Sequence, residues 1–133
     1  MKVVVDPNVL VAAAITDGVS ARLLDHWLTV RSFEPIVCPM LIAELRDVLG
    51  RDKFRRWITR TEATLLLERL EREAELRSDP VDIPQSTPDP KDDYLVALYR
   101  EADADALVTG DADFTGLSGE LAVMTPAETL ARL

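Results

Sequence analysis

The chain has 133 residues, of which 47% are hydrophobic and 29% are charged, as in a single globular domain rather than a disordered tail. Its only cysteine, Cys38, excludes an intrachain disulfide, and its only histidine, His26, disfavours a histidine-based metal site or a Ser-His-Asp triad. The net charge of −9 argues against a conventional DNA-binding module, but it is compatible with an enzyme that holds metal with clustered acids.

The first half of the chain alternates between strand and helix patterns. Lys2–Val5 is typical of a buried parallel strand, and Asp6 and Pro7 then suit the cap and the first turn of a helix. The next elements expected are a helix from Ser20, a short strand between Pro35 and Pro39, a helix over Met40–Leu49, and a long helix capped by Thr61 that ends near Leu76. The apolar run Val9–Ile15 is too short for a membrane span, and it lacks the pattern of a signal peptide. We therefore expect a cytoplasmic protein with no membrane partner.

The second half continues the same alternation. Val81–Ile83 is at most a short edge strand, and the proline-rich run Pro84–Pro90 is a loop. The remaining elements expected are a helix from Asp92 or Asp93 to about Ala102, strands at Ala106–Thr109 and Leu121–Met124, and a C-terminal helix that Thr125 caps. The alternation predicts an α/β fold with a parallel sheet, in one domain that spans residues 1–133.

Several acids lie where the predicted strands end, which is where α/β sheets bind ligands. They are Asp6, Asp92, Asp93, Asp111 and Asp113, and Glu44 joins them from beside the buried stripe of its helix. Each acid alone fits an ordinary helix cap, turn or solvated position. Together they would repel one another, and a hard divalent cation such as Mg²⁺ or Mn²⁺ removes that cost. The pattern therefore favours metal-assisted phosphoryl chemistry.

Four segments of the chain, in order, resemble the PIN-domain ribonucleases. They are VVVDPNVLVAAAI, CPMLIAELRDVLGRDKF, PDPKDDYLVALYREADADALVTGDADF and VMTPAETL, of which the third is the most specific. The chain looks closest to the bacterial and archaeal group that supplies the toxins of toxin–antitoxin modules. Pro7 departs from the family pattern, which usually has Thr or Ser there, and we expect a small effect because position 7 faces away from the acids.

The resemblance implies a three-layer α/β/α sandwich with a mostly parallel sheet of about five strands, and a metal-dependent endoribonuclease. It implies that Asp6, Glu44, Asp93 and Asp111 are the catalytic acids and metal ligands, with Asp113 as an auxiliary ligand. Asp93 is preferred to Asp92 because its spacing to the following strand fits the family pattern. The implied supporting residues are Asn8, Thr109 and Asp92. One or two Mg²⁺ or Mn²⁺ ions, an RNA substrate, a small antitoxin and a second copy of the chain are the implied cofactors and partners.

A basic stretch follows the helix that carries Glu44. Its members Arg51, Lys53, Arg55 and Arg56 are candidates for contacts with an RNA backbone, while the plainer interpretation is a solvated surface. The aromatic residues that suit base stacking are Trp27, Trp57, Tyr94 and Tyr99. Of these, Trp57 is expected to be exposed, whereas Trp27 and Tyr99 are expected in the core.

Other functions fit the same features less well. A receiver domain would need an acid pair after the first strand and a lysine after the last, and an aspartyl phosphatase would need an acid where Asn8 stands. An acidic interaction module without catalysis stays open, and metal dependence would distinguish it from a nuclease. A housekeeping RNA-processing nuclease also stays open as an alternative to a toxin.

Overall fold

A computed structural model describes residues 1–117 and 119–133. Its strands form one sheet in the order β3-β2-β1-β4-β5, and each pair of neighbours is parallel. The strands are β1 (Lys2–Val5), β2 (Glu34–Val37), β3 (Glu75–Leu76), β4 (Ala106–Val108) and β5 (Val123–Met124). The predicted α/β fold with a parallel sheet of about five strands is confirmed.

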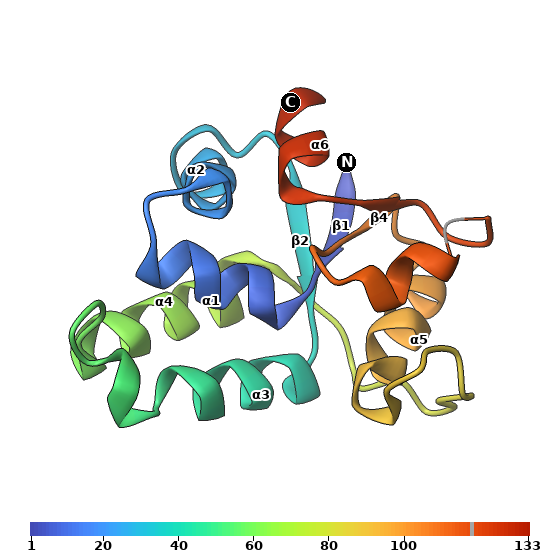
Figure 1. Cartoon of the computed structure of the whole chain (residues 1–133), viewed down its shortest axis with the longest axis horizontal. Coiled ribbons are helices and arrows are strands. Elements are labelled where there is room, and N and C mark those ends of the chain that lie inside the picture. The colour runs from blue at the N-terminus through green and yellow to red at the C-terminus, as the bar shows by residue number, and fades with distance from the viewer. Residues whose placement is uncertain (118) are drawn as a thin grey trace.

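Helices connect the strands and cover both faces of the sheet. The α-helices are α1 (Pro7–Ile15), α2 (Val19–Asp25), α3 (Pro39–Leu49), α4 (Arg60–Glu73), α5 (Asp93–Glu101) and α6 (Pro126–Ala131). The shorter turns are η1 (His26–Val30), η2 (Asp52–Phe54), η3 (Pro90–Asp92) and η4 (Ala112–Leu117). Figure 1 shows α1, α3 and α4 on one side of the strands and α5 on the other, which is the predicted three-layer arrangement. Over the described residues, no helix is long and apolar enough to cross a membrane.

The middle strand, β1, lies at the centre of the core. Val3 and Val4 are fully buried there, between β2 and β4. Strands that are buried on both faces favour β-branched side chains, and this preference explains the valine run. Because all the strands are parallel, their carboxyl ends lie at one edge of the sheet, where Asp6 follows β1 and Thr109 follows β4. We call this the carboxyl edge.

The edge strand of the sheet lies in a different segment from the one predicted. Helix α4 ends at Glu73 rather than near Leu76, and Glu75–Leu76 forms β3 beside β2. The backbone N–H of Arg77 extends this pairing by donating to the carbonyl of Val37 at 2.8 Å. The exposed residues Val81–Ile83 form no strand. The end of α4 is therefore set by the pairing of the following residues with the open edge of β2. Helical periodicity in the sequence cannot predict this end.

The cap of α4 is Thr59, and the prediction of Thr61 is wrong. The Thr59 hydroxyl accepts a hydrogen bond from the backbone N–H of Glu62 at 3.0 Å. The Glu62 carboxylate in turn accepts one from the Thr59 N–H at 3.0 Å. This complete capping box satisfies two backbone donors that would otherwise lack partners, and it therefore sets the start of the helix.

We expect Thr59→Ala to lower the free energy of unfolding by about 1 kcal/mol, because the mutant loses the cap acceptor. Thr61→Ala is the matched control, and it should change stability little because Thr61 is exposed within the first turn. Urea denaturation of both variants would measure the difference. Equal losses in the two variants would contradict the assignment of the cap.

Candidate metal centre

The first carboxylate at the carboxyl edge is Asp6, and only 2% of its surface is exposed. Its Oδ1 accepts a hydrogen bond from the backbone N–H of Asn8 at 2.9 Å, and its Oδ2 accepts one from the Thr109 hydroxyl at 2.8 Å. Burial raises the pKa of Asp6 above its ordinary value, although both hydrogen bonds oppose this shift. Thr109 thus contacts Asp6 through its side chain, whereas Asn8 contacts it through the backbone.

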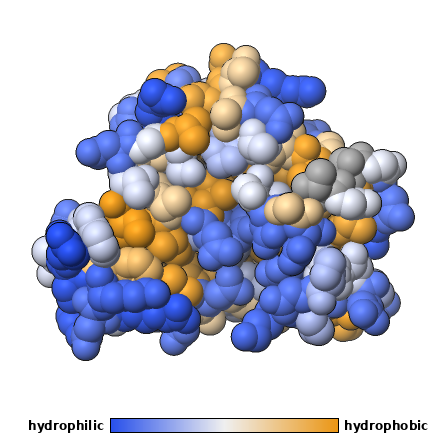
Figure 2. Space-filling view, viewed as in Figure 1, coloured by the Kyte–Doolittle hydropathy of each residue, from blue (hydrophilic) through white to orange (hydrophobic). Residues whose placement is uncertain are grey.

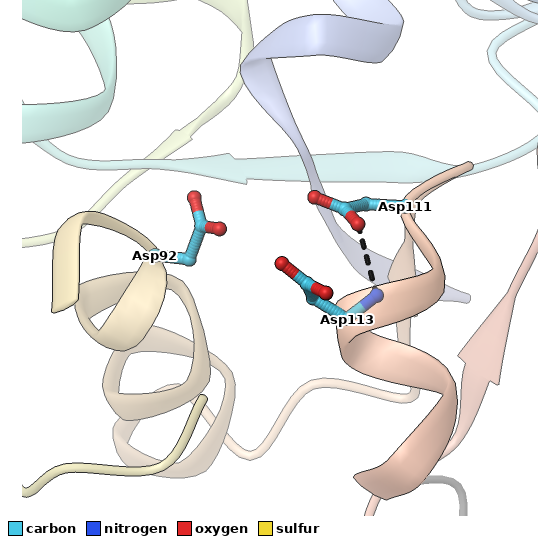
Figure 3. Close-up of side chains that lie close together, drawn as sticks. All are labelled: Asp92, Asp111 and Asp113. Atoms are coloured by element: carbon cyan, nitrogen blue, oxygen red, sulfur yellow. Dashed lines mark hydrogen bonds between the residues drawn. The ribbon is translucent and has the colours of Figure 1, made fainter. Parts of the chain in front are cut away.

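The turn after β4 brings two further acids to this edge. The Thr109 hydroxyl, which donates to Asp6, also accepts a hydrogen bond from the backbone N–H of Asp111 at 3.0 Å. Asp111 Oδ1 then accepts one from the N–H of Asp113 at 2.9 Å, as drawn in Figure 3. One threonine therefore holds the position of Asp111 relative to Asp6.

The start of α5 supplies the third part of the site through Asp92. Figure 3 shows the side chain of Asp92, the last residue of η3, facing Asp111 and Asp113 on the opposite turn. One carboxylate oxygen of each of these three residues lies within 4.8 Å of the other two. Burial, and after it the charges of neighbouring acids such as Asp6, raise the pKa of Asp92 to about 6. An all-carboxylate set of donors suits a hard cation such as Mg²⁺ or Mn²⁺, which would remove this repulsion.

Asp93, preferred to Asp92 from the family spacing, lies outside this group of three acids. It is buried, and its Oδ1 accepts hydrogen bonds from the N–H groups of Ser86 and Thr87 at 3.1 and 2.9 Å and from the Thr87 hydroxyl at 2.8 Å. Burial alone would raise the pKa of Asp93, but these hydrogen bonds together lower it. Asp93 thus holds the preceding loop while Asp92 faces the other acids, and which of the two binds an ion stays a prediction.

Glu44 approaches the same edge from α3, where it is half-buried. Its Oε1 accepts a hydrogen bond from the Tyr94 hydroxyl at 3.2 Å. Burial raises the pKa of Glu44, and the charge of Asp6 adds to this shift while the Tyr94 hydrogen bond opposes it. Glu44 thus has a protein partner and is electrostatically coupled to Asp6, but it is not one of the three acids whose oxygens converge.

Two residues at this edge have contacts that sequence analysis did not predict. Tyr94 suited base stacking, yet it is only 4% exposed and donates to Glu44 instead. Thr87 lies in the proline-rich loop and holds Asp93 through its backbone and its hydroxyl. In the sequence, the only indication of the role of Tyr94 is its position directly after the acids at the start of a predicted helix. The loop around Thr87 has no periodic pattern, so the sequence gives no indication of the role of Thr87.

A surface pocket of about 330 Å³ lies next to Asp6 and Asp111. Asn8, Ser20 and Gly110 contribute to its wall. This volume is at the lower end of the range for small-molecule sites, so the acids border open space that a substrate group can enter.

The basic stretch lies at the far end of α3 and divides into three groups. Arg51 and Arg60 pair with Asp47 and Asp52 at 3.5 and 3.1 Å, respectively. Arg55 turns inward, and its guanidinium donates to the carbonyl of Leu49 at the end of α3. Lys53 and Arg56 instead lie over aromatic rings. The four predicted RNA-contact residues are therefore not equivalent, and Arg55 has a structural partner.

The PIN domain family model PIN_3 matches residues 2–113, and the chain belongs to the PIN-domain family. The matched segment contains β1 to β4 and all the acids described above. No curated protein matches the sequence.

Two solved structures share the fold. A chain from the crystal structure of VapBC2 from Rickettsia felis, bound to a DNA fragment from the promoter, has a TM-score of 0.64 at 13% identity, and the match covers 94% of this chain and 98% of that one. A chain from the crystal structure of FitAcB from Neisseria gonorrhoeae has a TM-score of 0.54 at 17% identity, with the same coverage of 94% and 98%. These similarities show a common architecture along nearly the whole chain.

Proposed function

We propose that this PIN-domain chain is a metal-dependent endoribonuclease that cleaves RNA at the carboxyl edge of its sheet. The observation that supports the proposal most is the approach of Asp92, Asp111 and Asp113 oxygens to within 4.8 Å of one another, beside the buried Asp6. A bound Mg²⁺ or Mn²⁺ ion supplies polarisation of the phosphate and a lower pKa for the attacking water.

The acids differ in the tasks that their surroundings allow. Asp92, Asp111 and Asp113 would hold one or two ions. Asp6 accepts one hydrogen bond at each oxygen, and since each oxygen has a second lone pair it keeps capacity to bind an ion. Glu44, which Tyr94 holds, would reach the site directly or through a water molecule. Asp93 keeps the loop before α5 in place, and we propose Asp92 rather than Asp93 as the ligand.

Cleavage of a structured RNA pool by the purified protein tests this proposal. Cleavage is expected with Mn²⁺ or Mg²⁺ and not with EDTA, and Asp6→Asn should reduce the rate by at least about 100-fold while leaving the fold intact. The matched control is Asp82→Asn, in an exposed loop outside the site. Cleavage that persists in EDTA, or equal rates in the wild type and Asp6→Asn, would contradict the assignment.

We further propose that the chain is the toxin of a toxin–antitoxin pair. Its fold is shared with chains from the VapBC2 and FitAcB complexes. Helix α1 has half-buried apolar side chains at Ala12, Ala14 and Ile15, and Figure 2 shows hydrophobic surface in this region next to the hydrophilic centre of the molecule. An apolar face beside an acidic site suits a small antitoxin that covers α1 and places a basic side chain among the acids. Homodimerisation stays a prediction, which light scattering of the purified protein would test.

The alternative, an acidic binding module, needs no cation for its function. Titration of Mn²⁺ by calorimetry separates the two functions, because a nuclease site should release binding heat that disappears in Asp111→Asn. A housekeeping nuclease would pass this test as well. Growth arrest on expression of the wild-type chain, relieved by Asp6→Asn, would favour the toxin.

A further inference from the structure

The turn between α3 and α4 gathers two aromatic rings and two cations at the surface. The Phe54 and Trp57 ring centroids are 6.4 Å apart, with the planes tilted by 52°. Lys53 Nζ lies 5.1 Å from the centroid of Phe54, and the guanidinium carbon of Arg56 lies 4.9 Å from that of Trp57. We call these four residues the aromatic–basic cluster. Trp57 is 51% exposed, so half of its surface is free for a ligand.

The two cations of the cluster differ from the arginines beside it. Arg51 and Arg60 are neutralised by Asp47 and Asp52. Among the residues that the structure describes, no ion pair involves Lys53 or Arg56. In a chain with a net charge of −9, these two cations, one over the exposed ring of Trp57 and one over the half-buried ring of Phe54, form a local binding surface for anions.

The cluster follows the C-terminal end of α3, the helix that carries Glu44. This helix carries Glu44 near its middle and ends at Leu49, before the turn that holds the cluster. The six residues from Glu44 to Gly50 advance by roughly 9 Å at the helical rise. A stacked nucleic-acid strand advances about 3.4 Å per nucleotide, so about three nucleotides cover this part of α3, between Glu44 and the start of the turn.

We propose that the aromatic–basic cluster binds single-stranded RNA beyond the C-terminal end of α3, outside the cleavage site, an inference that rests on the proposed function. One base stacks on the exposed face of Trp57, while Lys53 and Arg56 contact phosphates. Exposed rings combined with cations are the features by which proteins bind single strands without reading their sequence, since every base has a π-face. These two cations favour RNA over a protein partner. RNA carries a negatively charged phosphate at every nucleotide, so a bound strand offers each cation an anion to contact.

The fluorescence of Trp57 provides a direct test. The other tryptophan, Trp27, is only 2% exposed, so its emission serves as an internal constant. We would titrate the wild type with a single-stranded oligouridylate in EDTA, which separates binding from metal-dependent cleavage. Saturable quenching is expected. Trp57→Ala, followed by anisotropy of the labelled RNA, should weaken binding by about 5-fold or more, and Trp57→Phe should restore part of the loss.

The cations are tested separately through the dependence of binding on salt. Lys53→Gln and Arg56→Gln should each weaken binding and reduce the slope of log K against log salt by roughly 0.7. Arg132→Gln, an exposed substitution at the other end of the chain, is the matched control. Circular dichroism of each variant verifies that the fold is retained.

Unchanged RNA affinity in Trp57→Ala and in both cation variants would overturn the proposal. Trp57 emission that responds to a protein partner but not to RNA would also overturn it, and would make the cluster a protein interface. Metal-dependent cleavage with an unchanged KM in Trp57→Ala would retain the nuclease and reject the cluster. Binding through the cluster without cleavage would retain the cluster and reject the nuclease.

Discussion

Replacing Asp92 with alanine is expected to reduce metal-dependent RNA cleavage by at least about 100-fold without lowering the melting temperature. The reason is that Asp92 faces Asp111 and Asp113, and its burial among like charges raises its pKa to about 6. Removing it would delete a proposed ligand and would also relieve repulsion in the metal-free protein. Rates measured across Mn²⁺ concentrations, together with thermal unfolding in EDTA, would test both parts.

The adjacent residue supplies the control. Asp93→Ala should lower the free energy of unfolding by about 3 kcal/mol, because it leaves buried donors of Ser86 and Thr87 without their charged acceptor. Its cleavage rate per folded molecule should fall much less than that of Asp92→Ala. The reverse pattern, with a stable but inactive Asp93→Ala and an active Asp92→Ala, would return the ligand role to Asp93.

Millimolar Mn²⁺ is expected to raise the melting temperature, and by more at pH 7 than at pH 5. Burial raises the pKa of Asp6 and of Glu44, and it raises that of Asp92 to about 6. A carboxyl whose pKa rises on folding binds more protons in the folded state, so the metal-free protein loses stability as pH increases from the ordinary value towards 6. Above pH 6 the carboxyls are charged and bind the cation, whereas at pH 5 protons compete with the cation for the same oxygens.

The expected size of this effect follows from mass action. A cation at about 100 times its Kd stabilises the folded state by roughly 2.7 kcal/mol. Asp111→Asn should remove most of the response, and the exposed Asp82→Asn should keep it. Differential scanning fluorimetry at both pH values measures the shift. A response that is the same at pH 5 and pH 7, or that survives in Asp111→Asn, would contradict a carboxylate metal site.

The choice between Asp92 and Asp93 shows where sequence reasoning stops. Successive residues at the start of a helix point in directions about 100° apart, so two adjacent acids cannot both face the same site. The donors that select Asp93 as the anchor come from the loop residues Ser86 and Thr87. Nothing in the loop's proline-rich pattern predicts that these groups converge on one carboxylate, because that requires the path of the backbone.

The edge strand of the sheet is a second feature that the sequence predicts only in part. The leucine pattern predicts the helix now seen as α4, but the departure of the chain into β3 depends on the open edge of β2. The basic stretch likewise predicts a charged surface. Only the folded chain shows that Arg55 donates to Leu49 while Arg56 lies over Trp57.

By itself the sequence determined the alternation of strands and helices, the burial of β1 and the gathering of acids at the carboxyl edge. These features follow from local patterns, since β-branched runs form buried strands and parallel strands end at one edge. The tertiary structure alone decided which acids face one another, which cations remain unpaired and where the edge strand forms. Those outcomes depend on contacts between distant segments, such as the Thr109 hydroxyl that joins Asp6 to Asp111.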